Sequence, residues 1–450
     1  MAAALLALGS CANRRLLRQP DLGDMPAAFD DAGFPRGAGA DAGWSILYPD
    51  TVLQGLIRHA LEHNKDLRIA AARVREMVAA KRIDFAGMFP ALNAQAYADL
   101  EYLNYGGRDK KYSPEIHANL SVGWEINFLG KQIWQNRAGK AAYLESVEAQ
   151  RSLHLTIVAS VAQLWFELTA LDRKLEITRQ TLAARQEQMR FARLRYEGGL
   201  TSEIPYRQSL VELARTQTLV PQLEQEIRLK ENDLSVLVGD YPGGIPREAA
   251  PEMRPITPDI PVGLPSEVLL ARPDVAAARQ RLDRARAEAG VAYASMFPSL
   301  RLTGHLGGES GELSDFLKSP TWFWSGLVTG PLFNMGRNKA RHRASVAAYE
   351  QEALRYEKTV MDVFREVNNA LTVFRKTREI YGAVEQYYNS ARQYNELTRL
   401  QWVNGVISYL DVLDAQRQLF DAQVALNDAA LRERTSVVSL YKALGGGLAE

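Results

Sequence analysis

The sequence has few cysteines, few histidines and no excess of charge of either sign. One cysteine among 450 residues excludes an intrachain disulfide and a multi-cysteine metal site. With 54 Lys+Arg against 53 Asp+Glu, the chain has no basic field that would attract nucleic acid. No run approaches the ~18 consecutive apolar residues that a membrane-spanning helix needs. A spanning β-strand needs only ~9–11 residues of alternating character, so a membrane protein built from strands stays open.

Signs of catalysis are also missing. His59 and His63 are four apart, but Ala60 occupies the position where a zinc-protease helix carries glutamate. Residues 307–311 (GGESG) lack the strand–turn–helix context of a nucleophile elbow, and no phosphate-binding glycine motif is present. The sequence therefore predicts no enzyme, no cofactor and no metal site.

A short apolar run opens the chain, and LGSC follows it at residues 8–11. This resembles the lipobox of bacterial lipoproteins, in which the cysteine after the cleavage site is acylated. It implies a signal peptide over 1–10, a lipid anchor at Cys11 and an acylated extension over 11–50. The alternative is a lone cysteine near a frayed end.

The rest of the chain is one unit written twice. MFP at 88–90 recurs 208 residues later, and three glycines of the first half recur after 206 residues at Gly336–Arg337, Gly405 and Gly445. A constant offset over so long a span indicates duplication. We expect a first repeat over 51–240, a proline-rich linker over 241–265, a second repeat over 266–446 and a tail over 447–450.

Each repeat contains a helical stretch (51–88 and 266–295), two alternating segments and two long helices. Period-two alternation puts apolar and polar side chains on opposite faces of a strand. In the first repeat, residues 92–102 and 116–128 carry apolar side chains at even positions, and the connections 103–115 and 307–320 are polar. In the second repeat one face carries the following residues: Leu300, Leu302, Leu306, Trp322, Trp324, Val328 and Leu332.

These four strands suit a tilted bilayer crossing, although a half-buried soluble sheet would alternate in the same way. Four strands are too few to close a membrane barrel, since the smallest have eight. A membrane passage would therefore require an oligomer of several chains.

Residues 131–195 have no proline and predict a helix on the order of 100 Å long. Apolar positions at alternating steps of four and three indicate a coiled-coil seam. They are Ile157, Val161, Leu164, Leu168, Leu171, Leu175, Thr178 and Leu182, repeated at Val363, Val367, Ala370, Phe374, Thr377, Tyr381, Val384 and Tyr388. Partner helices over 204–238 and 410–444 complete two hairpins, and Pro221 should kink or interrupt the first.

The longer motifs resemble the TolC-type outer membrane factors, in the lipoprotein branch related to NodT and OprM. The string GLPSEVLLARPDV (263–275) is the most specific. WEINFLGK (124–131), GPLFNMGR (330–337) and YLDVLDAQ (409–416) resemble the two strand-to-helix joins and the motif at the inner end of the tunnel.

The resemblance implies an α+β membrane channel, a homotrimer whose twelve-stranded outer membrane barrel continues as a periplasmic helical barrel. It implies a lipid-anchored protein of a Gram-negative outer membrane that exports drugs or other small molecules. Its partners would be outer membrane lipid, a periplasmic adaptor and an inner-membrane transporter of the RND type, with no nucleic acid.

The resemblance also implies two sets of functional residues. The periplasmic gate would be Leu410, Asp411 and Asp414, although aspartates in a first helical turn are also favoured by the helix dipole. The adaptor would dock on the hairpin tips, which otherwise are simple helix reversals: Gly198, Gly199, Leu200, Thr201, Ser202, Asn404, Gly405, Val406, Ile407 and Ser408. The rival to the channel is a periplasmic coiled-coil scaffold or adaptor component without a pore.

Overall fold

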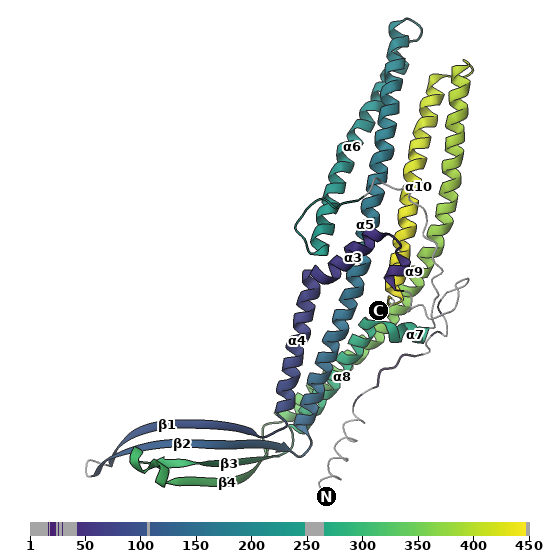
Figure 1. Ribbon diagram of the computed structural model, residues 1–450. Helices are drawn as coiled ribbons and strands as arrows, with labels where there is room; N and C mark the ends of the chain where they lie inside the picture. The colour runs from purple at the N-terminus through teal and green to yellow at the C-terminus, as the bar shows by residue number, and fades with distance from the viewer. Residues whose placement is uncertain are drawn as a thin grey trace. The chain divides into compact units, whose positions relative to one another are not determined.

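The computed structural model describes residues 17, 19–23, 26, 29, 43–105, 109–247 and 265–446 (Figure 1). It forms two compact units. The strand unit contains Ala71–Ala149 and Asp274–Thr359, and the hairpin unit contains Gln150–Pro273 and Val360–Glu450, each with a segment from before residue 71. Both units take segments from both halves of the chain, so the compact units cut across the predicted duplication.

The order of elements repeats in the two halves. The first half contains α2 (Trp44–Leu47), α3 (Thr51–His63), α4 (Lys65–Ala86), β1 (Ala91–Tyr105), β2 (Asp109–Asn127), α5 (Lys131–Glu197) and α6 (Glu203–Val238). The second half contains α7 (Pro265–Ala271), α8 (Pro273–Ala294), β3 (Ser299–Ser310), the 3₁₀ helix η1 (Leu313–Lys318), β4 (Pro320–Thr329), α9 (Arg337–Val403) and α10 (Tyr409–Ala443).

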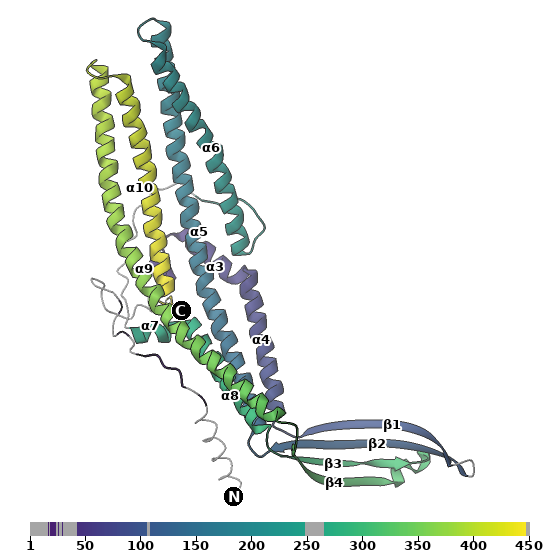
Figure 2. The same cartoon turned by 180° about the vertical axis from the view of Figure 1, so that it is seen from behind.

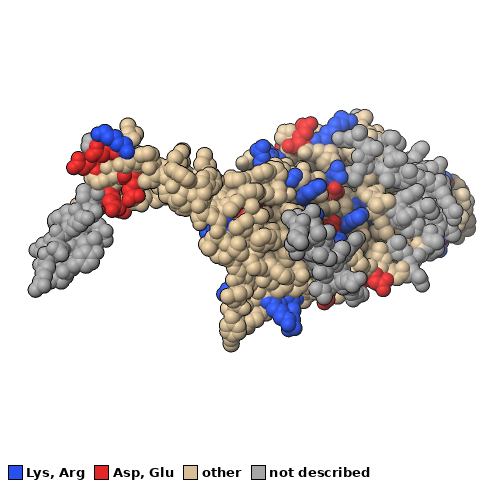
Figure 3. Space-filling model, turned by 90° about the horizontal axis from the view of Figure 1, so that it is seen from below, with Lys and Arg blue, Asp and Glu red and all other residues tan. Residues whose placement is uncertain are grey.

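The four strands form one antiparallel sheet in the order β1-β2-β3-β4. The register pairs even residues with even residues: Leu120 lies between Ala94 on β1 and Leu306 on β3. The predicted faces are therefore confirmed. The even face exposes large apolar side chains such as Leu100 and Trp322, each 71% exposed. In Figure 3 the middle of the sheet carries almost no charged side chains on the visible face, and charges gather at its outer end.

The strands are longer and the connections shorter than expected. Pairing continues to Tyr105 opposite Asp109, and β3 reaches Ser310. The polar residues assigned to the connections extend the ladder because it pairs their backbone N–H and C=O groups. Leu332 lies beyond the end of β4 at Thr329, where Pro331 cannot donate to a ladder.

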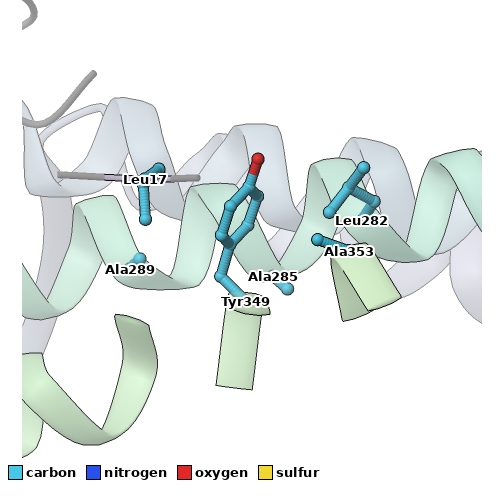
Figure 4. Packing of buried hydrophobic residues seen from close by; sticks show 6 residues of the cluster. All are labelled: Leu17, Leu282, Ala285, Ala289, Tyr349 and Ala353. Atoms are coloured by element: carbon cyan, nitrogen blue, oxygen red, sulfur yellow. The ribbon is translucent and has the colours of Figure 1, made fainter. Parts of the chain in front are cut away.

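The helices of the strand unit pack closely through small side chains. Leu282, Ala285 and Ala289 of α8 meet Tyr349 and Ala353 of α9, and Leu17 joins the same buried cluster (Figure 4). Alanines let the two helices approach, and the Tyr349 ring fills the remaining space.

Two helical hairpins, α5–α6 and α9–α10, make up most of the hairpin unit (Figures 1 and 2). Helices α5 and α9 each have 67 residues, about 100 Å at 1.5 Å per residue. Both predicted seams are confirmed: Val161, Leu168, Val367 and Phe374 are buried. An 18-residue stretch of α5 has a mean hydropathy of 1.3, but 61% of it is buried inside the structure, as expected of a core helix.

Helix α6 continues through Pro221, so the predicted interruption is wrong. The helical turns before and after Pro221 keep the helix continuous, and Pro221 lies on its exposed side. At the equivalent position of α10 the buried Asn427 donates from Nδ2 to the carbonyl of Ala170 on α5, at 3.0 Å. The difference between the repeats at this position thus provides a bond between the two hairpins.

A joint occurs at equivalent positions of the two repeats in the hairpin unit, with a different side chain in each. In the first half the buried Asn64, between α3 and α4, donates to the carbonyl of Leu237 at 2.7 Å. In the second half Arg272, between α7 and α8, donates to the carbonyl of Ala443 at 2.5 Å and to Glu366 at 2.7 Å. We call these the first and second helix joints. Each fastens the end of α6 or α10 to the residue that connects the first two helices of its repeat.

Candidate functional site: hairpin tips and the start of α10

Each hairpin reverses at a tip built from the same backbone turn. Gly199 and Gly405 have φ of +70° and +73°. The N–H of Leu200 donates to the carbonyl of Arg195 at 2.8 Å, and the N–H of Val406 makes the equivalent bond at 2.9 Å. A positive-φ glycine with this six-to-one bond is the Schellman helix ending, so both predicted reversals are present.

Both tips expose apolar side chains. Leu200 is 73% exposed and Val406 is 69% exposed. Further exposed apolar residues surround them: Leu194 and Ile204 beside the first tip, and Leu397, Leu400 and Val403 beside the second. Apolar groups gathered at an exposed end are typical of a protein-binding surface.

Asp411 caps helix α10. Its Oδ2 accepts from the backbone N–H of Ser408 at 2.9 Å and from the Ser408 hydroxyl at 2.8 Å, which completes a capping box. The structure therefore gives Asp411 a helix-capping role, in the first turn where the sequence analysis gave stabilisation by the helix dipole as the alternative to a gate.

Leu410 and Asp414 line a groove of about 510 Å³ between α6 and α10, together with Arg207 and Val211. They are four residues apart and share one helix face. Asp411, three residues before Asp414, is not among the residues that line the groove. The predicted trio thus divides into a groove-lining pair and a cap.

Within the groove the charge of Asp414 is partnered. Its carboxylate accepts from Arg417 and, at 2.6 Å, from Nε2 of Gln418. Leu410 is half-exposed. The groove therefore presents an apolar side chain beside a carboxylate held by its own helix.

The two hairpins are tied together just beyond the tips. The Tyr409 hydroxyl lies 3.1 Å from the Ser209 hydroxyl of α6, and burial raises the pKa of the Tyr409 phenol. The Tyr409 ring also contacts Trp402. The contact between Tyr409 and Ser209 holds the first turn of α10 against the neighbouring hairpin.

The long hairpins, the sheet with one apolar face and the tips agree with comparisons to known proteins. The model of the outer membrane efflux protein family matches residues 56–240 and 264–446. The chain belongs to this family. It is 30% identical over 416 residues to the probable outer membrane lipoprotein SilC of Salmonella typhimurium, with 91% of this chain and 89% of that protein covered.

Two further comparisons agree. The toluene efflux pump outer membrane protein TtgC of Pseudomonas putida is 32% identical, with 91% of this chain and 86% of that protein covered. The solved structure of the outer-membrane channel OprN is 26% identical and superposes with a TM-score of 0.87, covering 96% of this chain and 99% of that one.

Membership settles the architecture and the place of action. The protein is an outer membrane channel of an efflux system, and three chains combine their four strands into one twelve-stranded barrel. The exposed apolar face of the sheet is therefore the lipid side of the barrel wall, and the polar face lines the passage. The relatives are outer membrane components of efflux pumps, which excludes the alternative of a periplasmic scaffold without a pore.

The predicted lipid anchor and the two helix joints concern residues outside the tips and the groove. Cys11, the expected lipid anchor, lies outside the described residues. The helix joints were not predicted as sites, although Arg272 lies in the most specific string. The 208-residue offset that relates Asn64 to Arg272 is the signal that identifies them.

Proposed function

We propose that this channel completes a tripartite efflux assembly with a periplasmic adaptor and an inner-membrane transporter of the RND type. The observation that carries the proposal is the pair of matching tips, 198–202 and 404–408, with exposed apolar side chains at both. Three chains would present six such tips, each able to pack against a helical hairpin of the adaptor. Drugs or other small molecules would then pass into the barrel, with the transporter choosing the cargo.

Docking is tested by changing both tips at once. The variant Gly199→Trp/Gly405→Trp puts bulk at the turn, where no neighbouring atom lies within 4 Å of an added Cβ. The matched control is Gly199→Asn/Gly405→Asn, because asparagine tolerates positive φ. We expect the Trp pair to assemble as a trimer but to abolish drug efflux in a host strain lacking its own copy, and the Asn pair to retain efflux. Normal efflux by the Trp trimer would refute docking at the tips.

We further propose that Leu410, Asp411 and Asp414 form the periplasmic gate of the trimer. Leu410 would narrow the entrance, and rings of carboxylate would attract cations. The groove that contains Leu410 and Asp414 and the exposure of Leu410 support this assignment.

The gate is tested by replacing both aspartates with asparagine, which removes the charge but keeps an oxygen that can accept the bonds from Ser408. We expect Asp411→Asn/Asp414→Asn to raise the planar-bilayer conductance and lower cation selectivity. The control Glu396→Gln, which removes the charge of an exposed glutamate paired with Arg392 on α9, should change neither. Conductance and selectivity equal to wild type in the Asn pair would rule out the gate.

We also propose that Cys11 is acylated and anchors the protein to the membrane. The LGSC sequence and the label of the relative SilC as a lipoprotein support acylation of Cys11. Labelled palmitate should enter the wild-type protein and not Cys11→Ala. Equal labelling of the two would exclude this anchor.

A further inference from the structure

The polar face of the sheet brings together three metal-ligating side chains that the channel function does not require. Glu115 and His117 lie two residues apart on β2, so both point to the same face. The register pairs His117 directly with Glu309 of β3. Among the described residues, ligand atoms of these three groups lie within 4.8 Å of one another.

The imidazole of His117 is held between the two carboxylates. Its Nε2 lies 3.2 Å from Oε2 of Glu115, and its Nδ1 lies 3.8 Å from Oε2 of Glu309. The Tyr97 ring, from the strand on the other side, stacks on it at 4.4 Å with an interplanar angle of 15°. The His117 side chain is 14% exposed. A stacked imidazole on a paired strand has little freedom to turn, which is what a preorganised ligand requires.

The glutamates supply the movement that coordination needs. Their side chains are 46% and 51% exposed, so both can rotate. Ligand atoms around a tetrahedral ion with bonds of about 2.0–2.2 Å are separated by about 3.5 Å. The present spacing therefore closes to coordination distance by rotation of flexible carboxylates, without movement of the strands.

The surrounding charge also favours a cation. Asp99 of β1 is the direct cross-strand partner of Glu115, and like charges in that position repel. Two carboxylates thus flank the imidazole and a third lies opposite Glu115. His305, four residues from Glu309, meets the edge of Phe323. A bound divalent ion would offset this repulsion between the carboxylates.

We propose that Glu115, His117 and Glu309 form a binding site for a divalent transition-metal ion of the zinc class, one per chain, on the passage side of the barrel. One imidazole and two carboxylates suit Zn²⁺ and its neighbours in the series, and leave a position for water. Three protein ligands and an exposed setting make the ion exchangeable with the medium that fills the barrel. The site is independent of the adaptor, the transporter and the gate.

The experiment is zinc titration calorimetry on the untagged, full-length trimer in detergent. We expect one Zn²⁺ per chain at pH 7.5. Both His117→Gln and Glu309→Gln should weaken binding by roughly tenfold or more. Glu309→Gln leaves the stacking of His117 on Tyr97 in place, so its loss of zinc does not depend on damage to the sheet.

Two variants control for the other histidines. His305→Gln changes a histidine of the same face outside the cluster, and His59→Gln/His63→Gln removes the stacked histidine pair, of which His59 lies beside Asp240. Both should bind zinc like the wild type. Absence of binding by the wild type, equal binding by the two cluster variants, or loss of binding only in the His59/His63 variant would each overturn the proposal.

Discussion

The two helix joints allow one substitution to be tested against its own repeat-related copy. Gly239 and Gly445 end α6 and α10, with φ of +102° and +96°. Each is followed by a six-to-one bond, from Asp240 to Ser235 at 2.9 Å and from Gly446 at 3.0 Å. We consider replacement of each glycine by alanine. The backbone turns are alike, so any difference in effect must come from what surrounds the added methyl group.

The surroundings differ sharply. At Gly239 a Cβ would lie 2.6 Å from the backbone oxygen of His63 and 3.1 Å from the backbone nitrogen of Asn64, so the α3–α4 connection must move. At Gly445 the nearest atom is Cγ of Arg272, at 3.2 Å, so a movement of a few tenths of an ångström by this side chain is enough. Positive φ costs an alanine about 1–2 kcal/mol at either site. Overpacking against backbone and loss of the Asn64–Leu237 bond raise the cost at Gly239 to about 3–6 kcal/mol.

The assay is thermal unfolding of the purified trimer, followed by helical circular dichroism at fixed protein and detergent concentrations because oligomers unfold in a concentration-dependent way. Gly445→Ala should lower the apparent midpoint modestly and Gly239→Ala substantially more. If the two midpoints fall equally, or if Gly445→Ala falls further, the reasoning from close backbone contact is wrong.

Three further predictions follow from partly buried ion pairs of the hairpin unit. Burial raises the pKa of the Glu231 carboxyl, but hydrogen bonds from Arg247 and Arg228 outweigh burial and hold it below its usual value of 4.5. Its stabilising contribution is therefore complete above that value and is lost as pH falls through the lower folded pKa, so Glu231→Gln should show less loss of midpoint on acidification than wild type; identical pH profiles would contradict this. Arg247→Met leaves Asp172 and Glu231 without the guanidinium that joins them and should cost about 3–5 kcal/mol, which unchanged thermal stability would disprove. Arg272→Met should destabilise by about 1–3 kcal/mol, because it removes the bond to the carbonyl of Ala443 and the bond to Glu366, whose side chain is 42% exposed. A midpoint within about 1 °C of wild type would count against the joint.

Much of the fold could be predicted because its patterns are local. The alternation at 92–102 and 116–128 defined both faces of the first two strands, and the register confirmed them. The seam through Val161 and Leu168 defined the buried side of α5. Strand ends were less predictable, since the polar residues before Glu115 gave no sign that the ladder would continue through them.

Part of the candidate site could also be predicted from local patterns, and part could not. The reversals at Gly199 and Gly405 follow from glycine next to a long helical pattern. The sequence alone did not distinguish the capping role of Asp411 from the groove-lining role of Asp414, because both aspartates lie in the first turns of α10. That distinction depends on where the helix begins and on what α6 presents to it.

By itself the sequence determined the duplication, the two-faced strands and the seams of the long helices, because each of these is a spacing that the chain carries within one element or one repeat. Only the tertiary structure decided which groups from distant elements meet. The imidazole of His117 meets Glu309 through strand register, and Asn64 and Arg272 reach α6 and α10 through helix packing. Such meetings depend on long-range geometry, and no local periodicity records them.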